Sequence, residues 1–192
     1  MNKTLKWLGA GIALSLAAGC TTAPAPSIAL APPVVATSEL PYHWSQGDAP
    51  RAHQDAVALF GPMHLKPGQY LWTATIPNSK DTRVVVDLMS QLFYVYRGDK
   101  LAGVSTISSG KKGKETPVGL WSVKIKKRLG YSRKYDNAPM PYMQMYDTAG
   151  IAFHGGANPG YPASHGCIRL PLKFAARLYD LTTVGTKVVI EG

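Results

Sequence analysis

The chain has 192 residues, of which 45 % are hydrophobic and 17 % are charged, a composition that supports a packed core and excludes wholesale disorder. This length allows one domain with attachments. No apolar run reaches the roughly 20 residues that a membrane-spanning helix needs, and two cysteines are too few for a disulfide-stapled scaffold. The formal net charge of +10 indicates an anionic partner without naming one.

Residues 1–19 have the three parts of a secretory signal. Lys3 and Lys6 form a basic start, residues 8–18 form an uncharged apolar run, and small residues then lead to Cys20. The apolar run is too short to span a membrane. Removing this segment removes two lysines and no acidic residue, so the remaining chain stays basic.

Residues 16–20, Leu-Ala-Ala-Gly-Cys, resemble a bacterial lipoprotein box, in which the signal is cut before the cysteine and that cysteine carries lipid. The alternative is an ordinary signal peptide with an incidental cysteine. Thr21 stands where lipoproteins kept in the inner membrane often carry Asp, which favours the outer membrane of a Gram-negative bacterium. We therefore expect an exported periplasmic lipoprotein with a multi-chain lipid anchor, and export argues against nucleic acid as a partner.

Two segments precede the domain. Residues 20–41 hold the lipidated cysteine and a Pro/Ala-rich stretch, which predicts an extended tether, either a spacer or a passive tail. Residues 42–80 are an extension of uncertain role, for which structural packing is the leading interpretation. Within it, residues 50–60 predict a short helix that Gly61-Pro62 ends. The residues expected on one face of this helix are Ala52, Ala56, Leu59 and Phe60.

Residues 81–192 predict a mostly β domain. Short β-branched and aromatic runs indicate strands at residues 84–88, 92–96, 101–107, 120–125, 143–146, 151–153 and 188–190. One helix is predicted at Leu172–Leu181, because its apolar side chains recur at helical spacing.

Basic residues gather at two places, around residues 111–114 and 124–134. Lys124 and Lys126 flank Ile125, so we expect both on the solvent face of a strand. The cluster is interpreted either as a solvated face or as a surface for an acidic polymer.

The chemistry is expected at residues 151–156 and 164–171. Once Cys20 is lipidated, Cys167 is the only free thiol, and an unpaired thiol in an exported protein needs a reason. An imidazole that takes its proton would make it a strong nucleophile. His154 and His165 both compete for this role, and His154, arriving from another strand, has the freer geometry.

This pattern indicates acyl transfer through a thioester, with backbone N–H groups around Gly166 and Cys167 stabilising the oxyanion. One alternative is a buried cysteine that only packs. Another is zinc held by Cys167 with His154 and His165, but no carboxylate or second cysteine lies nearby to complete such a site. We expect no metal and no cofactor.

At these residues the sequence resembles the L,D-transpeptidase catalytic domain family of peptidoglycan enzymes. Ser164-His165-Gly166-Cys167 reproduces the second part of the family signature, and His154 at a strand end matches the first. Thr116-Pro117-Val118-Gly119 is similar to the family's Thr-Pro-x-Gly turn, and residues 84–96 to its opening β-hairpin. The resemblance covers roughly residues 83–191.

The resemblance implies an L,D-transpeptidase-like β-sandwich or barrel with one or two helices packed on it. It implies that Cys167 is the nucleophile, that His154 is the base and that the Gly155 carbonyl orients this base. It places Ser164, His165 and Gly166 around the thiol and the oxyanion site, and Arg169 where it could hold a stem-peptide carboxylate.

The implied function is a transfer reaction on peptidoglycan stem peptides. A thioester forms at the third stem residue with release of D-Ala and is then transferred to an amine, giving a 3→3 cross-link or attachment of an outer-membrane protein. The nearest alternative is an L,D-carboxypeptidase or amidase that hydrolyses the same thioester. A non-catalytic peptidoglycan-binding lipoprotein and a metal-binding periplasmic module are the alternatives from other classes.

Overall fold

The computed structural model describes residues 44–192. The expected signal peptide, the lipidation site Cys20 and the tether of residues 20–41 lie outside the described residues. Neither helix within residues 44–192 is long and apolar enough to cross a membrane.

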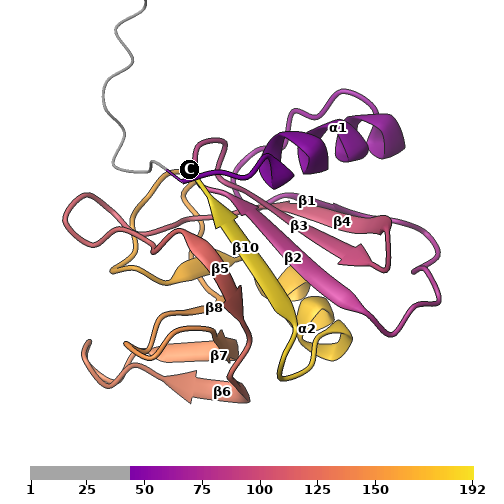
Figure 1. Cartoon of the computed structure of the whole chain (residues 1–192). Helices are drawn as coiled ribbons and strands as arrows, with labels where there is room; N and C mark the ends of the chain where they lie inside the picture. Colours follow the sequence, from indigo (N-terminus) through magenta and orange to yellow (C-terminus); the bar gives the residue numbers. More distant parts are fainter. Residues whose placement is uncertain (1–43) are drawn as a thin grey trace, which may run out of the picture. The chain divides into compact units, whose positions relative to one another are not determined.

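The described chain forms two β-sheets and two helices (Figure 1), as the sequence predicted. The larger sheet has the strand order β1-β4-β3-β2-β10-β5 and the smaller sheet β6-β7-β8-β9. The strands of the larger sheet are β1 (Tyr70–Trp72), β2 (Thr82–Asp87), β3 (Leu92–Arg97), β4 (Lys100–Thr106), β5 (Gly119–Ser122) and β10 (Lys187–Glu191). Those of the smaller sheet are β6 (Ile125–Tyr131), β7 (Pro139–Met145), β8 (Ala152–Gly155) and β9 (Ile168–Leu170), and the helices are α1 (Asp48–Phe60) and α2 (Leu172–Leu181).

The larger sheet is buried on both faces. Val84 and Val86 in β2 join the core that this sheet shares with α2 and the smaller sheet, whereas Val85 between them packs with α1. The helices lie on opposite faces of the larger sheet in Figure 1. Burial on both faces explains why β2 and β3 are continuous apolar runs rather than alternating ones.

Within residues 44–80, helix α1 packs on one face of the larger sheet. It begins at Asp48, two residues earlier than predicted, and Gly61 ends it with an N–H donated to Val57 O. Ala52 and Ala56 are buried against the larger sheet as expected, but Leu59 is 48 % exposed. Phe60 packs against the same core cluster, so the expected shared face is confirmed for Ala52, Ala56 and Phe60 and is wrong for Leu59.

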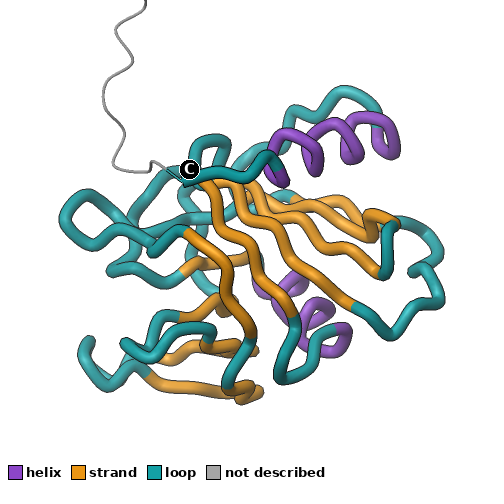
Figure 2. The backbone as a smooth tube through the Cα atoms, viewed as in Figure 1, coloured by secondary structure: helices purple, strands orange, loops and turns teal. Residues whose placement is uncertain are grey.

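The two ends of the described chain meet on the larger sheet (Figure 2). The carboxylate of Glu191 at the end of β10 accepts hydrogen bonds from the N–H groups of Gln46, Asp48 and Ala49, and Gly192 N–H donates to Trp44 O. These N–H groups lie at the start of α1, where a helix leaves donors unpaired and favours negative charge. Residue 191 therefore supplies the cap that α1 does not carry itself.

The strand predicted at 120–125 is broken in the structure. β5 ends at Ser122 and β6 begins at Ile125, because the chain passes here from the edge of one sheet to the edge of the other and buries Val123 in the core between them. β6 then continues to Tyr131. The prediction missed this continuation because most side chains of β6 are exposed and show no apolar alternation.

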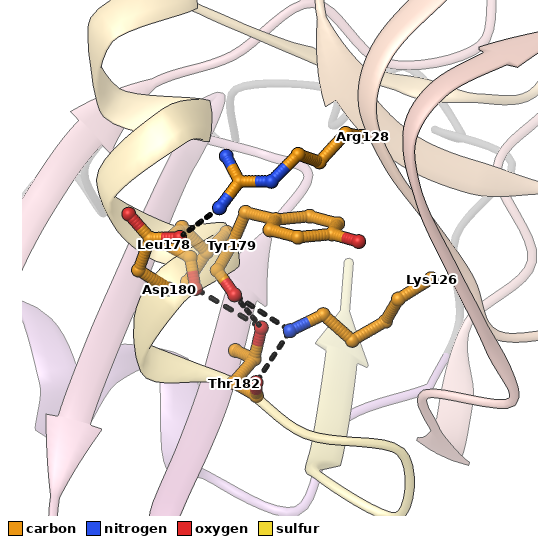
Figure 3. Close-up of polar contacts among 6 residues, drawn as sticks. All are labelled: Lys126, Arg128, Leu178, Tyr179, Asp180 and Thr182. Atoms are coloured by element: carbon orange, nitrogen blue, oxygen red, sulfur yellow. Dashed lines mark hydrogen bonds and ion pairs between the residues drawn. The ribbon is translucent and has the colours of Figure 1, made fainter.

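Lys126 is not on a solvent face, which corrects the expectation that it sits beside Lys124 in solvent. Its ammonium donates to two carbonyl oxygens at the C-terminal end of α2, Tyr179 O at 2.6 Å and Thr182 O at 2.5 Å (Figure 3). Unpaired carbonyls at a helix end attract such a cation. Lys126 therefore attaches the smaller sheet to α2.

Candidate active site

The predicted catalytic residues meet on one face of the smaller sheet. β8 and β9 are parallel neighbours, and His154 is paired with Arg169. Phe153 and Ile168 point into the core between the sheets, so the residues that alternate with them point the opposite way. This opposite face, called the reactive face below, carries His154 and Arg169.

Cys167 lies one residue before β9, on the same side as Arg169. Continuing the register by one residue places it beside Ala152, with which its side chain packs, and the Ala152 backbone hydrogen-bonds to the thiol. His154 is two residues further along β8 than Ala152. The thiol and the imidazole are therefore diagonal neighbours on adjacent strands.

One hydrogen bond sets the protonation pattern of His154. Its Nδ1 lies 2.9 Å from the carbonyl oxygen of Gly155. A carbonyl oxygen can only accept, so Nδ1–H must donate, and Nε2 of the neutral ring carries the lone pair. The imidazole is thus held in the tautomer that can accept a proton at Nε2.

Burial keeps both reactive groups neutral at rest. His154 is 8 % exposed, and burial lowers its pKa, with the Arg169 charge adding to the decrease and the Gly155 hydrogen bond opposing it. Burial also raises the pKa of the Cys167 thiol, opposed by the Ala152 hydrogen bond and by Arg169. The resting pair is a thiol and a neutral imidazole, so thiolate forms when a proton moves between them.

Sequence reasoning missed two parts of this environment. Met140, Met143 and Met145 form an apolar wall packed with Ala152 and Cys167. Asp147 is buried, accepts the Ile151 N–H at 2.6 Å, and raises the pKa of the Cys167 thiol. The Met-x-x-Met-x-Met spacing of β7 was visible in the sequence, but regular alternation would put Met140 and Met143 on opposite faces. The irregular backbone at Tyr142, with φ +57°, lies between them.

The catalytic loop, residues 164–167, is braced from within by Ser164. The hydroxyl of this buried serine donates to Cys167 O at 2.5 Å and accepts the Gly166 N–H at 3.0 Å. Gly166 was expected near the oxyanion, but its N–H is already committed to Ser164. Gly166 has φ +117°, and a Cβ there would lie 2.8 Å from Ile151 Cδ1, so the loop needs glycine at this position.

A second brace comes from the Thr-Pro-x-Gly turn. The Thr116 hydroxyl is buried, accepts the Gly110 N–H at 2.9 Å and donates to Gly166 O at 2.8 Å. The turn was recognisable in the sequence. Its contact with the catalytic loop, 50 residues later, was not.

His165 does not join the reactive pair. Its ring is exposed and stacks on Tyr135, with ring centroids 4.2 Å apart and planes 24° from parallel. Tyr135 belongs to the β6–β7 loop, residues 132–138. This loop therefore lies against the catalytic loop, and of the two histidines only His154 lies on the strand beside Cys167.

No set of three His, Cys, Asp or Glu side chains among residues 44–192 is arranged to hold a metal ion. The zinc alternative thus finds no ligand set in the part of the chain that the structure describes. A nucleophilic thiol, an oriented imidazole and a guanidinium on one face suit acyl transfer instead.

Comparison with known proteins decides the family. A model of the YkuD family, described as the L,D-transpeptidase catalytic domain, matches residues 81–190, more than half of the chain. The chain belongs to the L,D-transpeptidase catalytic domain family. The family and the fold class that the sequence predicted are confirmed, and with them an enzyme domain.

Solved L,D-transpeptidases share this fold. The enzyme from Mycobacterium smegmatis is 21 % identical with a TM-score of 0.54, covering 58 % of this chain and 59 % of its own. The one from Stackebrandtia nassauensis is 22 % identical with a TM-score of 0.55, covering 74 % and 67 %. A carbamoyl enzyme formed with avibactam, Ldtfm, is 29 % identical with a TM-score of 0.52, covering 58 % and 49 %. The chain therefore spans only part of the length of these proteins, and no curated protein matches it.

Proposed function

We propose that this protein is a cysteine-dependent L,D-transpeptidase that acts on peptidoglycan stem peptides. The observation that carries the proposal is the shared face of β8 and β9, on which Cys167 and His154 are neighbours and the Gly155 carbonyl fixes the imidazole tautomer. Membership of the L,D-transpeptidase family supports the substrate class.

In the first half-reaction, the Cys167 sulfur attacks the carbonyl carbon of the third stem residue while its proton moves to His154 Nε2. The carbon–nitrogen bond to the terminal D-Ala then breaks, and the imidazolium returns the proton to the leaving amine. A thioester remains on Cys167. A positioned acid–base group of this kind typically contributes 10²–10⁴-fold to the rate.

In the second half-reaction, an acceptor amine attacks the thioester carbonyl. His154 Nε2 takes a proton from that amine, and the sulfur leaves as thiolate and is reprotonated. A stem-peptide amine gives a 3→3 cross-link, and a protein lysine gives protein attachment. We assign to Arg169 the binding of a substrate carboxylate, and its pairing with His154 across the strands supports this role.

The test is the intact mass of the purified protein after mixing with a disaccharide-tetrapeptide muropeptide. We expect a Cys167-bound acyl adduct with loss of D-Ala, and no adduct on Cys167→Ala. Dimeric products would support transfer, whereas tripeptide products alone would identify the hydrolase. A folded, reduced sample that gives no adduct would overturn the thioester mechanism.

We further propose that the protein works in the periplasm as a lipoprotein anchored through Cys20. The lipoprotein-like residues 16–20 and the export signal support this. Labelling cells with a radioactive or clickable fatty acid tests it directly: wild type should be labelled, and Cys20→Ala should not.

A further inference from the structure

Positive charge is distributed unevenly along the described chain. Residues 108–147 contain nine Lys and Arg against three Asp and Glu, whereas residues 44–107 contain six against five. The basic segment includes β6, β7 and the turn that braces the catalytic loop. The excess charge therefore lies in the segment that forms two other strands of the smaller sheet and the turn contacting the catalytic loop.

Three of these basic side chains have structural partners. Lys134 donates to Ala149 O at 3.4 Å. Lys126 donates to the carbonyls of Tyr179 and Thr182 at the end of α2, and Arg128 pairs with Asp180 at 3.5 Å (Figure 3). Their charges are used in holding the smaller sheet to the helix. They do not explain the remaining basic residues.

Lys111, Lys112 and Lys114 have no such partner. All three are exposed, and Arg128–Asp180 is the only ion pair among residues 44–192. The one carboxylate in their loop, that of Glu115, accepts the Gly113 N–H at 2.6 Å. The loop is therefore built with its acidic group bound to its own backbone and its ammonium groups in solvent.

This lysine loop, residues 110–116, is fixed to the catalytic loop at two points. Lys111 N–H donates to Ser164 O at 3.0 Å, and the Thr116 hydroxyl donates to Gly166 O at 2.8 Å. These contacts fall on the residues directly before Cys167. A lysine carries its charge on a flexible four-carbon stem, so the three ammonium groups belong to a segment whose backbone is fixed to the catalytic loop.

We propose that the lysine loop is a carboxylate-binding subsite that makes this enzyme prefer stem peptides with free carboxyl groups over amidated ones. The inference rests on the proposed function and adds a specificity determinant to it. Stem peptides carry carboxyl groups on D-Glu and on diaminopimelate, and amidation removes their charge. The loop carries three ammonium groups against one carboxylate, that of Glu115, whose pKa is lowered by the Gly113 N–H and, to a lesser extent, by Lys112. This excess of positive charge attracts the charged form at a distance and gains nothing from a neutral amide.

The experiment compares two disaccharide-tetrapeptide muropeptides that differ only in amidation of the D-Glu and diaminopimelate carboxyl groups. The readout is kcat/KM for formation of the Cys167 acyl adduct, measured at low and at high salt. Wild type should prefer the free acid about three- to tenfold at low salt, and salt should reduce this preference by screening.

The test variant is Lys111→Gln, Lys112→Gln, Lys114→Gln combined, which should lose the preference and its salt dependence. The matched control changes three exposed lysines of residues 44–107 to glutamine, namely Lys66→Gln, Lys80→Gln and Lys100→Gln. It should behave as wild type. Alkylation by neutral iodoacetamide should be equal in all three proteins, showing that the thiol itself is unchanged.

The outcomes separate the two proposals. An adduct that forms equally fast with both muropeptides, or a preference that survives in the lysine-loop variant, overturns the subsite and leaves the transpeptidase proposal standing. A wild-type protein that alkylates normally but forms no adduct with either muropeptide overturns both.

Discussion

The two sheets of this domain use their faces differently. The larger sheet is covered on one face by α1 and on the other by α2 and the smaller sheet. The smaller sheet packs one face into the shared core and leaves the other for His154, Cys167 and Arg169. We therefore expect the larger sheet to contribute mainly to stability, whereas one face of the smaller sheet carries the residues proposed to react. Substitutions on the two sheets should separate these properties.

The reactive face should lose activity without losing stability. In His154→Gln, the Nε2 lone pair that accepts the thiol proton is gone, so we expect adduct formation with the muropeptide to slow by about 10²–10⁴-fold. The melting temperature should stay within a few degrees, because no core side chain is removed. Stopped reactions followed by intact mass give the rate. A variant with near wild-type rate would remove His154 from the mechanism.

The core between the sheets should show the opposite behaviour. Phe174 on α2 is fully buried, stacks on Trp72 at 4.7 Å and meets Phe93 edge-on at 5.9 Å. Phe174→Ala leaves a cavity there, and we expect the free energy of unfolding in urea to fall by about 3–5 kcal/mol. Well below the melting temperature, the rate of thiol alkylation should be unchanged. A loss of less than about 1 kcal/mol would show that the core collapses around the gap.

The cap that joins the chain ends should have a smaller, pH-dependent effect. Glu191 is 1 % exposed, and hydrogen bonds from Ala49, Gln46, Asp48 and Ser45 lower its pKa against the opposing effect of burial. Glu191→Gln should cost about 1–3 kcal/mol of unfolding free energy at pH 7.

Because the folded-state pKa of Glu191 lies below the unfolded value of about 4.3, its contribution is present above that pH and is lost as the pH falls through the folded pKa. Wild type and Glu191→Gln should therefore differ at pH 7, and the difference should shrink as the pH falls below the unfolded pKa of about 4.3 and through the lower folded pKa. Urea titrations at several pH values measure this. A difference that stayed constant with pH would mean that the charge contributes nothing.

The strands of the two sheets also differed in how well they could be predicted from the sequence. The strands of the larger sheet that are buried on both faces, β2 and β3, are continuous apolar runs, and both were predicted. The prediction for β3 ended one residue early, and that for β2 began two residues late and ended one residue late. The three-residue strands β1 and β9 were not predicted, because three residues do not establish a period. The helix Leu172–Leu181 was predicted with its observed bounds, since its apolar side chains recur on one face at helical spacing.

The site was predicted from residue types and motif rather than from periodicity. A single free thiol near two histidines indicates nucleophilic chemistry whatever the fold. Partners brought in from distant segments, such as Thr116 on the catalytic loop and Tyr135 on His165, depend on how the two sheets pack. Nothing local in the chain encodes that packing. Lys126 was expected in solvent and contacts α2 instead, because its position also depends on how the smaller sheet packs.

The smallest expected effects on unfolding free energy are those of Lys126 and Arg128, the two cations of β6 that contact the end of α2. Lys126 lies 4.2 Å above the Tyr179 ring as well as on its carbonyl, but burial lowers its pKa, so the cost of burying the charge offsets part of the gain. Lys126→Met, which keeps the apolar stem, should lower the unfolding free energy by about 1 kcal/mol. Arg128→Ala should cost less than about 0.5 kcal/mol, because the Arg128 and Asp180 side chains are 72 % and 64 % exposed and water screens such a pair. Equal losses in urea titrations of the two variants would show that the carbonyl contacts of Lys126 add nothing beyond a surface charge.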